Sequence, residues 1–181
     1  MQISKREKEK LNGFTIIELL VVIAVISIVT AFVLISYPGL NRVFSLQRSA
    51  SKLAQDVRMV EERAVSMIEL NGIPPAGYGI HLENGSYSYK ISAYEEKNLG
   101  DWSATDTWEE TINLEDGIKI SELKEGSVST STLDIVFEPP DPTVWVNNAS
   151  SSSSTITVYI ETEPTKTESI FVNSAGLINT R

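Results

Sequence analysis

The sequence predicts an α+β protein in which one long N-terminal helix precedes a head of mostly antiparallel strands. Three patterns predict this fold. An apolar run occupies residues 14–37, apolar residues then recur at helical spacing up to residue 67, and short alternating segments separated by turn residues follow in residues 73–181. One helical region followed by a run of strands is typical of the α+β class, and antiparallel pairing fits the short connections.

The apolar run is long enough to cross a membrane. Its 24 residues contain Glu18 as the only acidic or basic side chain. As a helix they extend about 36 Å, against a bilayer core of about 30 Å. The preceding residues 1–13 carry four basic and two acidic side chains, and a basic flank of this kind stays on the cytoplasmic side. We therefore expect a single pass through the cytoplasmic membrane, with the head outside the cytoplasm.

The helix is predicted to continue beyond the membrane as an amphipathic half, residues 38–72. Pro38 is expected to kink or locally melt it, and Asn71-Gly72 with the prolines that follow is expected to end it near residue 70. Apolar residues at alternating steps of three and four form one face, here called the seam. The seam fits a coiled-coil dimer or the strands of the same chain, and its two alanines favour the strands. The seam residues are Val43, Leu46, Ala50, Leu53, Val57, Val60, Ala64 and Met67.

The clearest element of the head is a hairpin. Residues 78–83 and 86–91 alternate in polarity around Asn84-Gly85, a dipeptide that is the strongest short signal for a hairpin. Loops are expected at residues 97–108 and in the serine-rich residues 147–154. Further strands are predicted at residues 111–114, 117–121, 133–138, 155–161 and 169–172, and a turn at 173–176 leads to 177–179.

Charge and composition exclude some functions. The net charge is −9, and residues 1–13 contribute +2, so the residues after Gly13 carry −11. This acidic surface repels phosphate backbones, and general nucleic-acid binding is not expected. The chain has no cysteine, which excludes disulfides, thiolate metal sites and cysteine nucleophiles.

No pattern in the head predicts catalysis, and we expect no catalytic residue, cofactor or metal. His81, the only histidine, is interpreted as an ordinary strand residue, and no Ser–His–Asp set can be selected. Trp102, Trp108 and Trp145 fit a ligand platform or, more often, the cover of a small core. Acidic clusters lack the spacing of a calcium loop and are interpreted as solvated surface. These are Glu95-Glu96, Asp101, Glu109-Glu110 and Glu115-Asp116.

Glu18 is the residue of the apolar run that most needs an explanation. An ionised carboxylate within a membrane helix costs roughly 3 kcal/mol, so such a residue is a functional candidate by default. If the chain were cut after Gly13, Phe14 would carry a free ammonium group. That group would lie one helical turn from Glu18, and residues four apart share a helix face.

The segment Gly13-Phe14-Thr15-Ile16-Ile17-Glu18, with the apolar residues after it, resembles the prepilin signature of type IV pilins and type II secretion pseudopilins. The resemblance implies that prepilin peptidase removes the leader 1–13 by cutting between Gly13 and Phe14, and that the new Phe14 amine is methylated. It also implies assembly with other pilin or pseudopilin subunits on an inner-membrane platform, into a periplasmic or cell-surface fibre. Glu18 would neutralise the Phe14 amine of a neighbouring subunit.

The head resembles the minor pseudopilin group FimT/GspH. The resemblance rests on Tyr-Gly-Ile-x-Leu at 78–82, Leu-x-x-Gly-Ile-x-Ile at 114–120 and Ile-Phe-Val-Asn-x-x-Gly-Leu-Ile at 170–178. It implies a structural subunit, a minor pilin or pseudopilin of a pilus-like or secretion fibre. The alternatives are a plain signal anchor at the N-terminus, a membrane-anchored extracytoplasmic binding module that does not polymerise, and an anchored enzyme, which the missing catalytic set disfavours.

Overall fold

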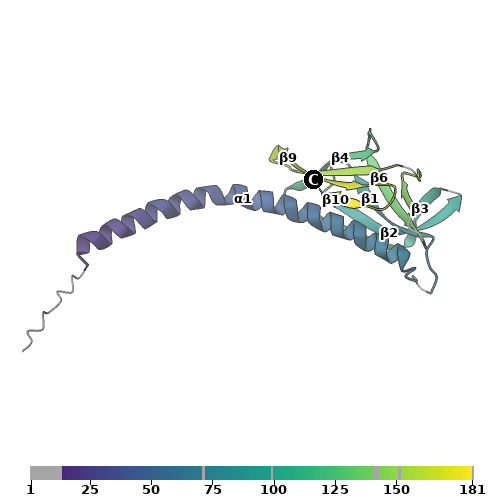
Figure 1. The fold of residues 1–181 in the computed structure, drawn as a ribbon, viewed down its shortest axis with the longest axis horizontal. Coiled ribbons are helices and arrows are strands. Elements are labelled where there is room, and N and C mark those ends of the chain that lie inside the picture. The colour runs from purple at the N-terminus through teal and green to yellow at the C-terminus, as the bar shows by residue number, and fades with distance from the viewer. Residues whose placement is uncertain (1–13, 71, 99, 141–142, 151, 181) are drawn as a thin grey trace, which may run out of the picture. The chain divides into compact units, whose positions relative to one another are not determined.

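The computed structural model describes residues 14–70, 72–98, 100–140, 143–150 and 152–180 (Figure 1). A single helix, α1 (Ile16–Val65), is followed only by strands in these residues, which confirms the predicted α+β class. The chain divides between Leu40 and Asn41 into two compact units. α1 is helical through Pro38 and Gly39, so the expected local melting is not found. A proline removes one backbone donor, and a helix of 50 residues can lose that hydrogen bond without ending.

α1 ends five residues earlier than the predicted end near residue 70. Met67 takes a left-handed conformation with φ of 47°. Its N–H donates to the carbonyl of Ala64 at 3.0 Å, and the N–H of Ile68 donates to the carbonyl of Arg63 at 3.3 Å. These two bonds form a Schellman cap, whose left-handed position is usually glycine. The helix ends before the stop signal expected at Asn71-Gly72. In the cap that ends it, Met67 occupies the left-handed position that is usually glycine.

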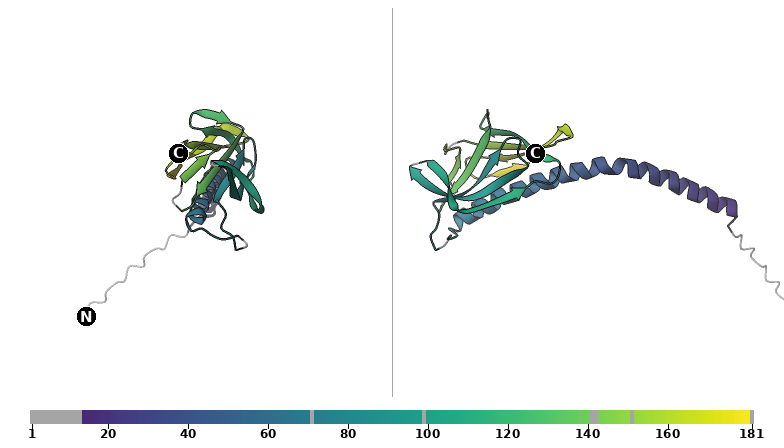
Figure 2. Two further views of the ribbon diagram at one scale, coloured as in Figure 1. Left: turned by 90° about the vertical axis from the view of Figure 1, so that its right-hand side faces the viewer. Right: turned by 180° about the vertical axis from the view of Figure 1, so that it is seen from behind.

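The strands form two five-stranded sheets in which every neighbouring pair is antiparallel (Figure 2). The order in the first sheet is β3 (Asp101–Asn113), β2 (Ser88–Asn98), β1 (Gly77–Glu83), β6 (Thr132–Glu138) and β7 (Thr143–Val146). The order in the second is β10 (Ile178–Thr180), β9 (Glu163–Val172), β8 (Ser154–Ile160), β4 (Ile118–Glu125) and β5 (Val128–Thr130).

The seam of α1 packs on both sheets and forms one core with them. Six seam residues are buried, and Leu53, Val57 and Val60 have no exposed surface. They join side chains such as Ile80 of β1 and Val158 of β8 in a single hydrophobic cluster. The prediction that the seam packs against the strands of the same chain is therefore confirmed. A coiled-coil dimer would need the same apolar face, which is already buried against the sheets. Of the other two, Val43 is partly buried against the same cluster, whereas Met67 is 48% exposed, because it lies beyond the end of the helix.

The predicted hairpin is confirmed as β1 and β2, with Leu82 opposite Tyr89. Gly85 in its turn has φ of 80°, which a glycine adopts without strain. Each further predicted strand overlaps an observed one: 111–114 lies at the end of β3, and the others overlap β4, β6, β8, β9 and β10. The turn at 173–176 is confirmed too, closed by a 3.1 Å bond from the Gly176 N–H to the Asn173 carbonyl.

The predicted loop at 97–108 is wrong. Asn98 ends β2, and β3 begins at Asp101 after a turn in which Gly100 has φ of 76°. The polar residues of this segment predict a loop. The segment nevertheless forms a strand, because the backbone hydrogen bonds that pair it with β2 need no apolar side chains. β5 and β7 were not predicted, because one has three residues and the other four, too few for a clear pattern. The predicted loop at 147–154 is confirmed for the described residues 147–150 and 152–153, and β8 begins at Ser154.

Candidate functional site

Thr15 starts α1 and fixes the position of the N-terminal site. Its side-chain oxygen accepts a hydrogen bond from the Glu18 N–H at 3.2 Å, and its carbonyl accepts one from Leu19 at 3.2 Å. Thr15 is therefore the N-cap of α1, and the pattern Thr-x-x-Glu is that of a capping box. In the sequence, Thr15 was identified only as part of the prepilin signature. A threonine followed three residues later by a glutamate also predicts the start of a helix.

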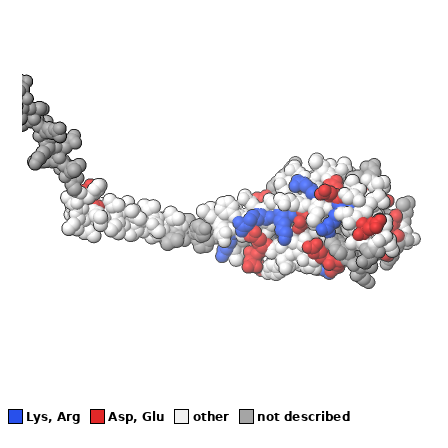
Figure 3. Space-filling view, turned by 90° about the horizontal axis from the view of Figure 1, so that it is seen from below, with Lys and Arg blue, Asp and Glu red and all other residues white. Residues whose placement is uncertain are grey.

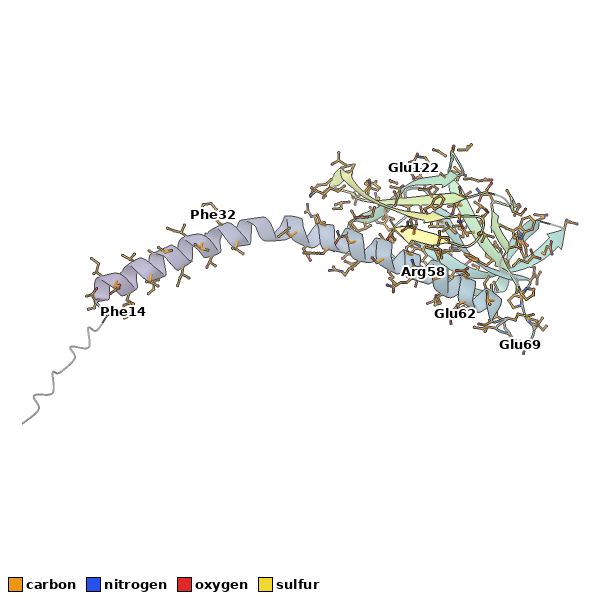
Figure 4. The ribbon with its side chains drawn as sticks, viewed as in Figure 1. Phe14, Phe32, Arg58, Glu62, Glu69 and Glu122 are labelled. Carbon is orange, nitrogen blue, oxygen red and sulfur yellow. The ribbon has the colours of Figure 1, made fainter. Side chains whose placement is uncertain are left out.

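Phe14 lies before the first helical residue of the uncleaved chain (Figure 4). In this uncleaved chain the N-cap at Thr15 leaves Phe14 outside the helix. The expected sharing of a helix face by Phe14 and Glu18 concerns the chain cut after Gly13 and stays a prediction. Phe14 is 81% exposed, and Glu18 is also exposed in the first turn. A carboxylate in the first turn is favourable beside the positive end of the helix dipole. Gly13 lies outside the described residues.

The first part of α1 has the properties of a membrane span. Ile16–Val33 is long and apolar enough to cross a membrane, and none of its residues is buried in the protein. Phe32 projects outward from the helix (Figure 4), and Figure 3 shows this segment without charge except at its N-terminal end. Two hydroxyls donate within the helix at 2.8 Å, Ser27 to the Ile23 carbonyl and Thr30 to the Ile26 carbonyl. Such bonds satisfy polar side chains without water. This helix is a candidate membrane anchor.

The second part of α1 is fixed to the sheets by polar contacts as well as by the seam. Arg48 donates two hydrogen bonds to Glu115, at 2.6 and 2.7 Å, and Ser49 accepts one from the Glu115 N–H at 3.1 Å. The guanidinium group lowers the pKa of the Glu115 carboxyl. Tyr89, nearly fully buried, donates to the Asp56 carboxylate, and burial raises the pKa of its phenol. These bonds fix which face of the helix meets the head.

A second cluster of aromatic side chains covers the outer face of the first sheet. Trp102 and Trp145 lie with ring centroids 6.0 Å apart, and Tyr94 and Val136 complete the buried part. A Cβ on Gly79 would lie 2.9 Å from the ring of Tyr94, so the glycine lets that ring pack directly on the β1 backbone. Two of the three predicted tryptophans therefore cover a small core. The side chain of Trp108 lies outside the described residues.

His81 has partners that the sequence did not display. Its Nδ1 lies 2.8 Å from Oδ1 of Asp134, directly across from it on β6, and its Nε2 lies 3.4 Å from Oε1 of Glu83. Tyr94 donates to the same Asp134 oxygen at 3.0 Å. The hydrogen bond with Asp134 raises the pKa of His81, and Glu83 adds to the effect. The interpretation of His81 as an ordinary strand residue thus missed a cross-strand ion pair.

The remaining candidates of the head stay without an assigned ligand. Among the described residues, no group of three or more His, Asp or Glu side chains is placed to hold a metal. Glu115 pairs with Arg48, and Glu109 with Lys90 at 3.0 Å. Two of the four acidic clusters thus contribute ion pairs to the surface, and both signs of charge are interspersed on the face shown in Figure 3. In the same part of the chain no hydrogen bond joins a serine to His81.

The His81 pair predicts a pH-dependent stability. Because the folded pKa is raised above the unfolded value of about 6.5, the stabilisation is full below that value and is lost as pH rises through the folded pKa. The cation faces Asp134 on β6, Glu83 on its own strand and Lys90 opposite on β2. We expect His81→Gln to lower the free energy of unfolding by about 1 kcal/mol near pH 6, and by less near pH 9.

The measurement is urea unfolding of the full chain, followed by tryptophan fluorescence at several pH values. His81 is the only histidine, so the difference between the parent and His81→Gln isolates this group. A difference that stays constant over this range would contradict the assignment.

Comparison with known proteins bears on the N-terminal site. Residues 10–34 match the family model described as the prokaryotic N-terminal methylation motif. No curated protein and no solved structure matches the chain. The motif, the apolar helix and the antiparallel head together support the class of type IV pilins and pseudopilins. The match supports processing by prepilin peptidase and assembly with other pilins, and it indicates a structural protein rather than an enzyme.

Proposed function

We propose that the chain is a minor pilin or pseudopilin, a structural subunit of a type IV pilus-like or type II secretion fibre. The observation that carries the proposal is the N-terminal methylation motif at residues 10–34, which coincides with an exposed apolar helix. Apolar side chains that the chain does not bury need another apolar environment, either lipid or the same helix of other subunits. A polymerising subunit uses both environments in turn.

The processing step removes residues 1–13. Prepilin peptidase cuts between Gly13 and Phe14, and the new amine of Phe14 is methylated. The start of α1 at Ile16, with Thr15 as its cap, supports this site, because it leaves Phe14 outside the helix. A peptidase can reach an extended backbone more easily than a helical one, whose N–H and C=O groups are already bonded.

Glu18 and Phe14 are the assembly residues. The carboxylate of Glu18 pairs with the Phe14 amine of a neighbouring subunit in the growing fibre. Desolvation makes an unpaired charge costly there, so the correct axial register is favoured over others. An uncleaved chain has no amine at Phe14 and therefore no partner for this carboxylate. Cleavage would thus act as the switch that licenses assembly.

The head supplies the specific task of the subunit outside the cytoplasm. The basic leader keeps the N-terminus on the cytoplasmic side and orients the single span, and an inner-membrane platform recruits the subunit. Within the class we propose the FimT/GspH group of minor pseudopilins. Support comes from the three sequence patterns of the head, which fall on β1, on the start of β4 and on β9 to β10.

The decisive experiment is co-expression with a prepilin peptidase, followed by mass measurement of the intact chain. We expect the parent chain to begin at Phe14, whereas Gly13→Val should keep residues 1–13, because a branched side chain blocks close approach to the backbone. The matched control is Gly39→Val, at an exposed helix position where an added Cβ meets nothing within 4 Å, and it should be cut normally. A parent chain that keeps its leader would favour the static membrane-anchored binding module instead.

A further inference from the structure

The outer face of the first sheet holds a cavity that the assembly function does not use. It lies where β1, β2, β3 and β6 come together and has a volume of about 320 Å³. Its most buried lining residues are Ser92, Tyr94 and Trp102, at most 8% exposed. Side chains of His81, Lys90, Glu109 and Asp134 complete the lining. The volume is at the lower end of the range for small-molecule sites.

Every charge at this cavity already has a partner of opposite sign. Lys90 Nζ lies 3.0 Å from Glu109 Oε1, and His81 Nδ1 lies 2.8 Å from Asp134 Oδ1. A charged ligand would have to displace one of these partners and would leave the other unpaired. A neutral ligand leaves both pairs intact and is therefore favoured.

The polar groups that remain are those of a hydroxyl-binding site. One oxygen of each carboxylate has a partner: Oε1 of Glu109 pairs with Lys90, and Oδ1 of Asp134 pairs with His81 and Tyr94. Among the described residues, the second oxygen of each carboxylate has no partner. The Nε1–H of Trp102 is buried and donates to nothing there. A buried donor without an acceptor is unfavourable, because it has lost its hydrogen bond to water and gained none in the protein. Two free acceptors and a free donor, on side chains that line the same cavity, match hydroxyl groups, each of which donates and accepts.

We propose that this cavity binds a neutral, hydroxyl-rich ligand, a sugar residue. Hydroxyl groups of the sugar donate to the free oxygens of Glu109 and Asp134, and one accepts from the Trp102 indole N–H. The aromatic rings of Trp102 and Tyr94 supply apolar surface on which the C–H groups of the sugar ring can pack. The proposal concerns the head alone and stands whether or not the subunit polymerises.

The test uses the full chain in a detergent without a sugar headgroup. Saturation-transfer NMR measures binding of the methyl glycosides of glucose, galactose and N-acetylglucosamine at millimolar concentration. Glucuronate is the charged comparison. We expect at least one glycoside to bind, and glucuronate to bind at least tenfold more weakly than methyl glucoside if glucose is the sugar bound, or not at all otherwise.

Two variants locate the site. Trp102→Phe removes the N–H donor but keeps an aromatic ring, and Glu109→Ala removes a surface acceptor with little consequence for folding. Each should raise the Kd at least tenfold. Glu161→Ala is the matched control, because Glu161 forms a comparable ion pair with Lys119 at 2.6 Å away from the cavity, and its Kd should not change. The proposal is overturned if no glycoside binds, if both variants bind as the parent does, or if glucuronate binds as tightly as the neutral sugars.

Discussion

Replacing Glu18 by alanine is expected to stop incorporation of the subunit into a fibre while leaving cleavage after Gly13 intact. The variant keeps the exposed apolar helix and the cap at Thr15, so insertion and processing proceed. Under the proposed pairing, it loses the partner of the Phe14 amine in the neighbouring subunit. An unpaired charge in a desolvated contact costs about 3–5 kcal/mol, which lowers incorporation on the order of 100-fold or more.

The measurement is the share of processed subunit recovered in sheared fibres, compared with the share that stays in the membrane. Glu18→Gln tests charge at constant size and should behave like Glu18→Ala. Glu62→Ala is the control, since Glu62 is an exposed acid in the head-packing part of the same helix (Figure 4). Normal incorporation of Glu18→Ala would disprove the proposed pairing. It would leave the proposed cleavage after Gly13 unaffected.

Replacing Leu53 by alanine is expected to destabilise the head by about 2–5 kcal/mol. Leu53 is fully buried in the cluster that joins the seam to both sheets. The loss combines the transfer of the removed carbon atoms with the cavity they leave. Because domains are stable by about 5–15 kcal/mol, this single change removes a large share of the total.

Chemical unfolding, followed by tryptophan fluorescence, checks this value. Lys52→Ala is the control, because Lys52 is the exposed neighbour of Leu53 on α1, and changes at such positions stay within about 0.5 kcal/mol. The loss should not depend on protein concentration, since the seam is covered by the same chain. A concentration-dependent midpoint, or a cost of Leu53→Ala no larger than that of Lys52→Ala, would contradict the packing.

The helix was predictable because its information is local. Leu46 to Ala64 recur at helical spacing, and burial on one face requires that spacing wherever the partner lies. The end of the helix was not predictable in the same way. Met67 adopts a left-handed conformation that its residue type does not favour, and a 2.8 Å bond from the Tyr78 hydroxyl to the Ile68 carbonyl lies beside it.

The hairpin of β1 and β2 was predictable for the same reason, because its signal lies in neighbouring residues. β7 was not predictable from its own residues. Its four residues, Thr143–Val146, gain strand structure by pairing with β6, where Trp145 lies opposite Val136. A strand this short has little propensity of its own, and its partner decides its conformation. Pairing with β2 likewise makes most of the predicted loop at 97–108 part of β3, although its polar residues do not predict a strand.

The sequence by itself determined that the chain has a long apolar helix with one carboxylate, preceded by a basic segment, and that a strand-rich head follows. These are properties of consecutive residues, and the matched motif at residues 10–34 is of the same kind. Only the tertiary structure brought His81 to Asp134 and Trp102 to Trp145, residues 53 and 43 positions apart. Such pairs depend on strand order and register, because a shift of one residue would turn each side chain to the opposite face of the sheet.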